Sequence, residues 1–195
     1  MATPPVSPPR RPFRALYRIL SRAPVLMCAT LLSASLAVAA PAAGDDLAPA
    51  QKALRKGEPA QALEFLDAYL RTAPDDPRAR FLKGVALADA GRRDEAIAVF
   101  LKLTEDHPEL PESYNNLAVL YAQQGLYERA RQALEMAIQA HPSYAVAHEN
   151  LGDLYIRMAT ISYEKAARLD AGSKTVPRKL ALARELMAPP PKPAP

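Results

Sequence analysis

The stretch YNNLAVLYAQQGLYERARQALEMAIQAHP at residues 114–142 decides the fold of this chain. Its central glycine, Gly125, has counterparts at Gly91 and Gly57, so the spacing is 34 residues each time. Three further columns keep this period: Ala62, Ala96 and Ala130; Leu66, Phe100 and Leu134; Pro74, Pro108 and Pro142. A fixed period of this length is typical of a solenoid built from repeated units.

Each unit is predicted to form two helices joined by its glycine. In the unit that begins at Pro77, RARFLKGVALADA precedes Gly91 and DEAIAVFLKLTED follows it. Glycine suits the left-handed position that ends a helix. Pro108 ends the unit because proline cannot continue a helix.

The units resemble tetratricopeptide repeats. The quoted stretch has an aromatic residue, Leu, a small residue, Tyr, Gly, Ala, Leu, Ala and Pro in the order of that family, and HENLGDLY at 148–155 repeats its opening. The resemblance implies an all-α fold, a right-handed superhelical solenoid of antiparallel helix pairs. The predicted repeat domain spans residues 49–187, with units at about 43–76, 77–110 and 111–144 and a shortened fourth unit at 145–171.

The fourth unit, LGDLYIRMATISYEKAARLD at 151–170, loses five residues of the period and has no turn glycine near 159. At 100° per residue, one apolar stripe nevertheless runs through the deletion without slipping. The stripe consists of Leu151, Gly152, Tyr155, Met158, Ala159, Ser162, Ala166 and Leu169. This continuity predicts one fused helix over about 145–170, and a compressed helix–turn–helix is the alternative.

A last helix is predicted at 176–187, between Gly172 and a proline-rich end. Leu180, Ala183, Leu186 and Met187 give it one apolar side, so we expect it to cap the array. Residues 188–195, APPPKPAP, are predicted to be a disordered tail.

Residues 1–39 have the composition of a secretory signal. They hold five arginines and no acidic residue, and the uncharged run Ala23–Ala43 contains small residues that favour cleavage after Ala39. Cleavage would leave a short linker at 40–48 and a periplasmic protein. The alternative is an uncleaved inner-membrane anchor that holds the repeats in the periplasm.

The rest of the chain gives no general electrostatic reason to bind nucleic acid. Its 20 basic and 21 acidic residues leave a net charge of −1. Contact with a membrane is therefore expected only through the N-terminal segment, if that segment stays uncleaved.

The first helix of each unit has two faces. Positions 4, 7, 8 and 11 of each unit fall on one face, which is predicted to pack inside the array. Its members are Arg80, Lys83, Gly84 and Leu87, then Tyr114, Leu117, Ala118 and Tyr121, then His148, Leu151, Gly152 and Tyr155.

In tetratricopeptide proteins the opposite face lines a concave groove that holds a partner's peptide or helix. The resemblance therefore implies a groove lined by Arg78, Phe81, Val85, Asp89, Glu112, Asn115, Val119, Gln123, Glu149, Asp153, Ile156 and Arg157. Phe81, Val85 and Val119 would make it partly apolar, while Glu149 and Asp153 would make its C-terminal end acidic. Such a groove suits an amphipathic helix or an extended apolar peptide. Among the positions that clamp a terminal carboxylate in some family members, only Asn115 has a suitable side chain.

The sequence carries no motif for catalysis: no G-x-S-x-G, no glycine-rich phosphate loop and no H-E-x-x-H. His107 and His141 are 34 residues apart and each precedes a proline, so they mark one repeat position rather than a metal pair. We therefore predict a non-enzymatic adaptor or scaffold of the bacterial envelope, with no metal and no cofactor, that binds another envelope protein. The alternative is a self-assembly module that dimerises through the long helix and the cap.

Overall fold

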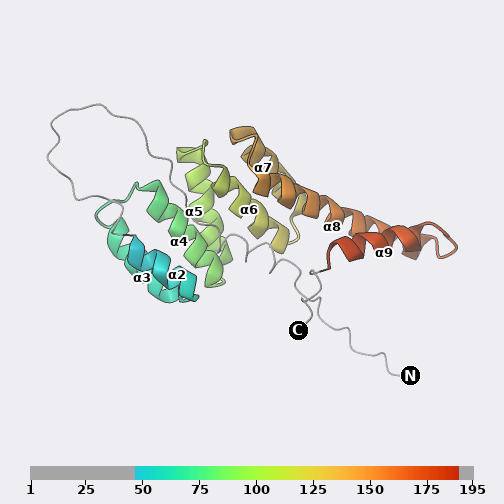
Figure 1. The fold of residues 1–195 in the computed structure, drawn as a ribbon, viewed down its shortest axis with the longest axis horizontal. Coiled ribbons are helices and arrows are strands. Elements are labelled where there is room, and N and C mark those ends of the chain that lie inside the picture. Colours follow the sequence, from blue (N-terminus) through green and yellow to red (C-terminus); the bar gives the residue numbers. More distant parts are fainter. Residues whose placement is uncertain (1–46, 189–195) are drawn as a thin grey trace, which may run out of the picture.

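The computed structural model describes residues 47–188, and within them the chain forms helices and no strand (Figure 1). In chain order the helices are α2 Ala48–Lys56, α3 Pro59–Leu70, α4 Pro77–Asp89, α5 Arg93–Asp106, α6 Pro111–Gln123, α7 Tyr127–Ala140, α8 Ala145–Leu169 and α9 Val176–Leu186. The predicted signal at 1–39, most of the linker and the tail beyond Ala188 lie outside the described residues. The all-α solenoid is confirmed.

Short turns pair α2 with α3, α4 with α5 and α6 with α7. Gly57, Gly91 and Gly125 end the first helix of each pair with φ of 75°, 77° and 77°, the left-handed region that glycine enters at little cost. Pro59, Pro77 and Pro111 occupy the first residue of their helices, where a missing N–H costs nothing.

The helices form two layers. The first helices α2, α4, α6 and α8 contact one another in series. The second helices α3, α5 and α7 make no comparable contact with each other in the described part of the chain. Because the first helices lie closer together than the second helices, the array curves and the first helices line its inner side.

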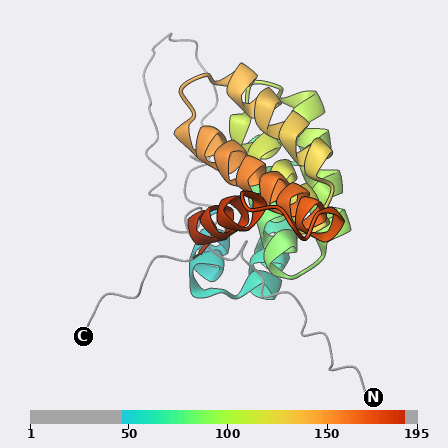
Figure 2. The same cartoon turned by 90° about the vertical axis from the view of Figure 1, so that its right-hand side faces the viewer.

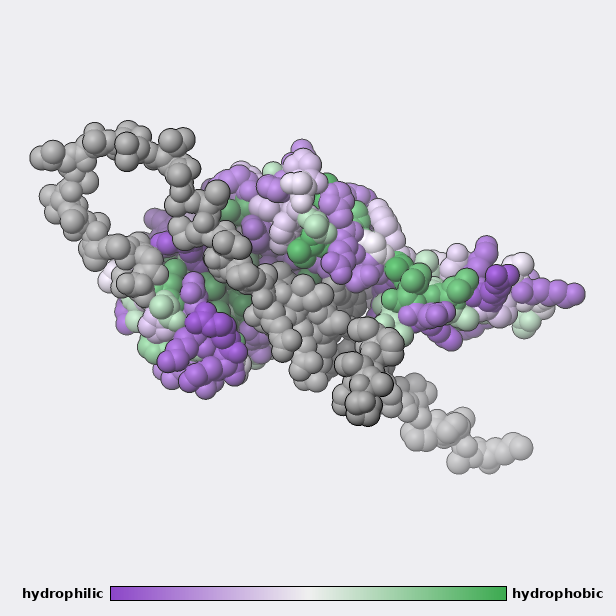
Figure 3. All heavy atoms as spheres, viewed as in Figure 1, coloured by the Kyte–Doolittle hydropathy of each residue, from purple (hydrophilic) through white to green (hydrophobic). Residues whose placement is uncertain are grey.

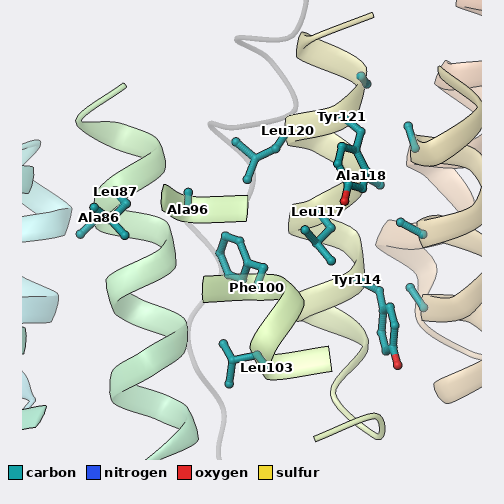
Figure 4. Close-up of a cluster of buried hydrophobic side chains, with 14 of the residues drawn as sticks. Ala86, Leu87, Ala96, Phe100, Leu103, Tyr114, Leu117, Ala118, Leu120 and Tyr121 are labelled. Atoms are coloured by element: carbon teal, nitrogen blue, oxygen red, sulfur yellow. The ribbon is translucent and has the colours of Figure 1, made fainter. Parts of the chain in front are cut away.

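The core follows the repeat columns of the sequence. Phe100 projects from α5 between α4 and α6 and is fully buried (Figure 4). Ala62, Ala96 and Ala130 are also fully buried, so each allows its helix to approach a neighbour closely. Gly84 of α4 makes room for Phe100, since a Cβ atom added to Gly84 would lie 2.7 Å from the Phe100 Cζ atom.

Gly84 and Gly152 occupy the same repeat position but have opposite surroundings, because a Cβ atom on Gly152 would meet nothing within 4 Å. We expect Gly152→Ala to stabilise the protein by up to about 1 kcal/mol through helix propensity. We expect Gly84→Ala to destabilise it by about 1–2 kcal/mol, because the buried Phe100 ring must move. Urea unfolding of both variants measures the difference, and a gain of stability in Gly84→Ala would contradict the close packing.

Arg80 and Lys83 were predicted on the packing face, and both are half-buried there with ion-pair partners. Arg80 Nη1 lies 2.8 Å from Asp106 Oδ2 of α5, and Lys83 Nζ lies 2.6 Å from Asp67 Oδ1 of α3. The two pairs connect α4 with the second helix of its own unit and with that of the preceding unit.

The fourth unit is one continuous helix, α8, as the stripe predicted. The prediction that its packing face is covered is wrong: His148, Gly152 and Tyr155 are exposed and Leu151 is only half-buried. The corresponding residues of α6 are all buried. The difference arises because α8 continues straight instead of turning, so no second helix of its own unit covers this face.

The C-terminal helix α9 packs along the second half of α8 (Figure 2). The Arg184 Nη2 atom donates to Glu164 Oε1 at 2.9 Å, and Lys179 Nζ lies 5.8 Å from the Tyr163 ring centre. Ala183 is buried against α8, but Leu186, predicted on the apolar inner side, is 69% exposed. The cap therefore leaves apolar surface at this end of the array.

Candidate functional site

The predicted groove residues lie on the first helices α4, α6 and α8, which form the inner layer. Exposed members are Arg78, Asp89, Glu112, Gln123 and Glu149; half-buried members are Phe81, Val85, Asp153, Ile156 and Arg157; buried members are Asn115 and Val119. The exposed groove residues of the inner layer are therefore polar, and half-buried apolar side chains lie among them.

On α4, the apolar part of this surface is anchored in the core. The Phe81 ring meets the Phe100 ring edge to face, with centroids 5.7 Å apart and an interplanar angle of 64°. This contact fixes the orientation of Phe81 while leaving part of its ring accessible.

Asp76 lies at the end of the first unit, where the sequence favours a capping residue, and it caps the start of α4. Its carboxylate accepts hydrogen bonds from the backbone N–H groups of Arg78 and Ala79 and from the Tyr69 hydroxyl. Partial burial acts to raise its pKa, but the hydrogen bonds from Arg78 and Tyr69 outweigh burial and lower the pKa of Asp76 to about 2. The Arg78 side chain is paired with this cap at 2.8 Å, which fixes it at the edge of the groove.

On α6, the expectation of a free face is wrong for two residues. Asn115 is fully buried and Val119 is 6% exposed. Both residues are buried because α6 has helices on several sides: it lies between α5 and α7 and also contacts α4 and α8. Val119 is consequently a poor site for a charged substitution that must leave the fold intact.

The burial of Asn115 is explained by Asn150 of α8, whose Nδ2 atom donates to the Asn115 Oδ1 atom at 2.7 Å. Asn150 was missed because its position in the unit belongs to neither predicted face. Asn115 and Asn150 are 35 residues apart, one more than the period, and in the structure this spacing joins them across adjacent first helices. The Nδ2 atom of Asn115 has no partner of its own in the part of the chain that the structure describes.

Four carboxyl groups, those of Asp89, Glu112, Glu149 and Asp153, give the groove an acidic character at its edges. Asp89 is exposed as a residue, but its carboxyl group is partly buried, and this burial raises the pKa of Asp89 to about 6. Burial, with the nearby Glu149 charge, also raises the pKa of Asp153. These groups favour a partner that brings cationic or hydrogen-bond-donating groups to the acidic edges.

The described residues offer little for chemistry. Between Leu47 and Ala188, no group of three or more His, Cys, Asp or Glu side chains could hold a metal ion. Over the same residues, no helix combines the length and the apolar character needed to cross a membrane. The groove is suited to binding a chain by side-chain contacts.

Comparison with known proteins identifies the repeat. The family model described as tetratricopeptide repeat matches residues 47–111, 86–145 and 115–157, which together cover more than half of the chain. The chain belongs to the tetratricopeptide repeat family. A tetratricopeptide-repeat-containing thioredoxin, TTL4 of Arabidopsis thaliana, is 35% identical over 80 residues; the match covers 41% of this chain and 12% of that protein.

Solved tetratricopeptide structures support the same fold. A crystal structure of MamA is similar with a TM-score of 0.52 and 25% identity, covering 70% of this chain and 82% of MamA. A double mutant of MamA RS-1 gives a TM-score of 0.52 and 27% identity, covering 74% of this chain and 86% of that one. Tetratricopeptide repeats are generally non-enzymatic modules for protein interaction, and the solenoid here is a scaffold of that kind.

Proposed function

We propose that this protein is a non-enzymatic adaptor of the bacterial cell envelope. It holds a peptide or amphipathic helix of another envelope protein against α4, α6 and α8. The observation that carries the proposal is the inner layer itself, where first helices contact one another and present Phe81, Val85 and Ile156 between exposed polar side chains. The export part rests on the signal-like composition of residues 1–39.

The groove favours an amphipathic ligand over a free carboxylate terminus. Half-buried apolar side chains suit the apolar side of a helix or extended peptide. Glu112, Glu149 and Asp153 lie on the same layer and would repel a terminal carboxylate. Cationic side chains along the ligand's polar side would complement them.

Position-specific photocrosslinking in the native cells tests the proposal. A photoreactive residue at Gln123 or Glu149, both exposed on the inner layer, should crosslink a defined set of envelope proteins. The same residue at Glu64 of α3 or Glu105 of α5, which are exposed on second helices, should give only background. Mass spectrometry of the crosslinked peptides should locate an amphipathic segment in each partner.

Charge-reversed variants test whether the groove is needed for partner capture. Glu112→Lys with Glu149→Lys should weaken partner capture because like charges would then face the ligand, while Glu64→Lys with Glu105→Lys should leave it intact. Equal crosslinking from both layers would overturn the groove assignment. Capture of cytoplasmic proteins alone would overturn the envelope assignment.

A further inference from the structure

The outer face of α8 carries exposed apolar residues that the groove does not use. The four most exposed large hydrophobic side chains in residues 47–188 all lie at this end: Leu169 at 78%, Leu186 at 69%, Leu182 at 52% and Tyr155 at 48%. Hydrophobic residues also gather over α9 and the adjoining part of α8 in Figure 3. We call Leu151, Gly152, Tyr155, Met158, Ala159, Ser162, Ala166 and Leu169 the α8 stripe. None of its members is fully buried, although Leu151 and Met158 pack partly against the core.

The repeat itself shows what normally covers this face. In α4, Gly84 receives the Phe100 ring of the second helix α5. In α6, the guanidinium carbon of Arg129 from the second helix α7 lies 4.7 Å from the Tyr121 ring centre. The corresponding residues of α8 are Gly152 and Tyr155, and both are uncovered. The stripe is therefore a surface on which one further helix could pack antiparallel to α8.

We propose that α8 of a second copy packs on the α8 stripe, so that the protein forms a homodimer with two antiparallel α8 helices at its centre. A two-fold axis perpendicular to two packed helices makes them antiparallel, which is the direction the missing helix would have. Gly152 and Ala166 are each seven residues from Ala159. With Ala159 at the axis, Gly152 of one copy faces Ala166 of the other, so small residues meet at these positions and let the two helices approach closely there.

Charge and size also fit a second copy. The stripe carries no charged side chain, so two copies can approach without bringing like charges together. Ser162 does not oppose burial, because its hydroxyl already donates to the Met158 carbonyl at 2.9 Å. The turn at Gly125–Tyr127 forms a shallow hollow beside Met158 and adds exposed Leu126 to the surface.

The available surface implies a reversible dimer. The eight stripe residues and the five further residues that line the hollow provide about 13 residues per copy, whereas stable interfaces use about 20–30. We expect dissociation in the micromolar range, so that the dimer depends on protein concentration.

Sedimentation velocity of the purified protein at about 1 to 200 μM tests the proposal. We expect a shift from monomer to dimer across this range. Gly152→Lys should raise the dissociation constant roughly tenfold or more, because its side chain blocks the helix approach. It should not lower the melting temperature, since the site is open and lysine favours helix more than glycine does. Ala98→Lys, an exposed small-to-lysine change on α5, is the matched control and should dimerise normally.

A cysteine probe locates the contact. Ala159→Cys, with Cys28→Ser to remove the natural thiol, should form a disulfide-linked dimer under mild oxidation because the two thiols meet at the axis. Ala98→Cys in the same background should not. A monomer at every concentration would overturn the proposal, as would a dimer that Gly152→Lys leaves unchanged.

Discussion

Replacing Phe100 with alanine is expected to cost about 3–5 kcal/mol of unfolding free energy, because Phe100 is the largest fully buried side chain among residues 47–188. Phe100 is fully buried, lies against Gly84 and meets the Phe81 ring at 5.7 Å. Its removal leaves a cavity that the flanking helices cannot fill, since Gly84 offers no side chain to move into it. Phe81 would also lose the contact that orients it in the groove.

Urea unfolding followed by circular dichroism measures this loss. Leu101→Ala is the matched control, because Leu101 is the next residue of α5 and is 40% exposed; its cost should stay below about 1 kcal/mol. Phe100→Leu should cost about 1–1.5 kcal/mol, since it keeps most of the volume. Equal losses for Phe100→Ala and Leu101→Ala would mean that Phe100 is not the centre of the core.

A proline at Ala159 is expected to cost about 3 kcal/mol or more, because Ala159 lies in the interior of α8. Its ring would remove the hydrogen bond to the Tyr155 carbonyl and clash with that group. The site is close to where the turn of an ordinary unit would fall, so the result separates the fused helix from a compressed helix–turn–helix. A turn would accept the proline with little loss.

Ala145→Pro is the control within the same helix. Ala145 is the first residue of α8, where proline is tolerated, as Pro59, Pro77 and Pro111 show in other helices. Hydrogen exchange should show lost protection around residues 155–163 in Ala159→Pro and little change in Ala145→Pro. Unchanged exchange in Ala159→Pro would contradict a continuous α8.

The sequence predicted the fold well because every unit repeats the same physical requirements. The small residues equivalent to Ala130, the large residues equivalent to Phe100 and the turn glycines each recur at a 34-residue period. The phase of the apolar stripe also predicted that α8 is unbroken. In each case the information lies within one helix or one turn.

The candidate site was harder to predict because burial depends on neighbouring helices. A helical wheel places Asn115 on a free face, but Asn150 of the adjacent first helix covers it. The same wheel places Tyr155 on a packing face, yet the helix that would cover it is missing. Leu186 was also placed wrongly, because a helical wheel does not show how α9 is rotated against α8, and Leu186 is exposed in the structure. That the groove holds a partner's peptide or amphipathic helix stays a prediction.

The burial of α6 has a consequence for the order in which the chain folds. Every residue from Ser113 to Ala122 is buried, and α6 contacts α4, α5, α7 and α8. In a linear array each element gains stability only from its neighbours, so α6 should exchange its amide hydrogens last and both ends should open first. Nucleation would then begin around α6 and α7 and spread outward. The α8 stripe would be completed late, when the rest of the solenoid is already in place.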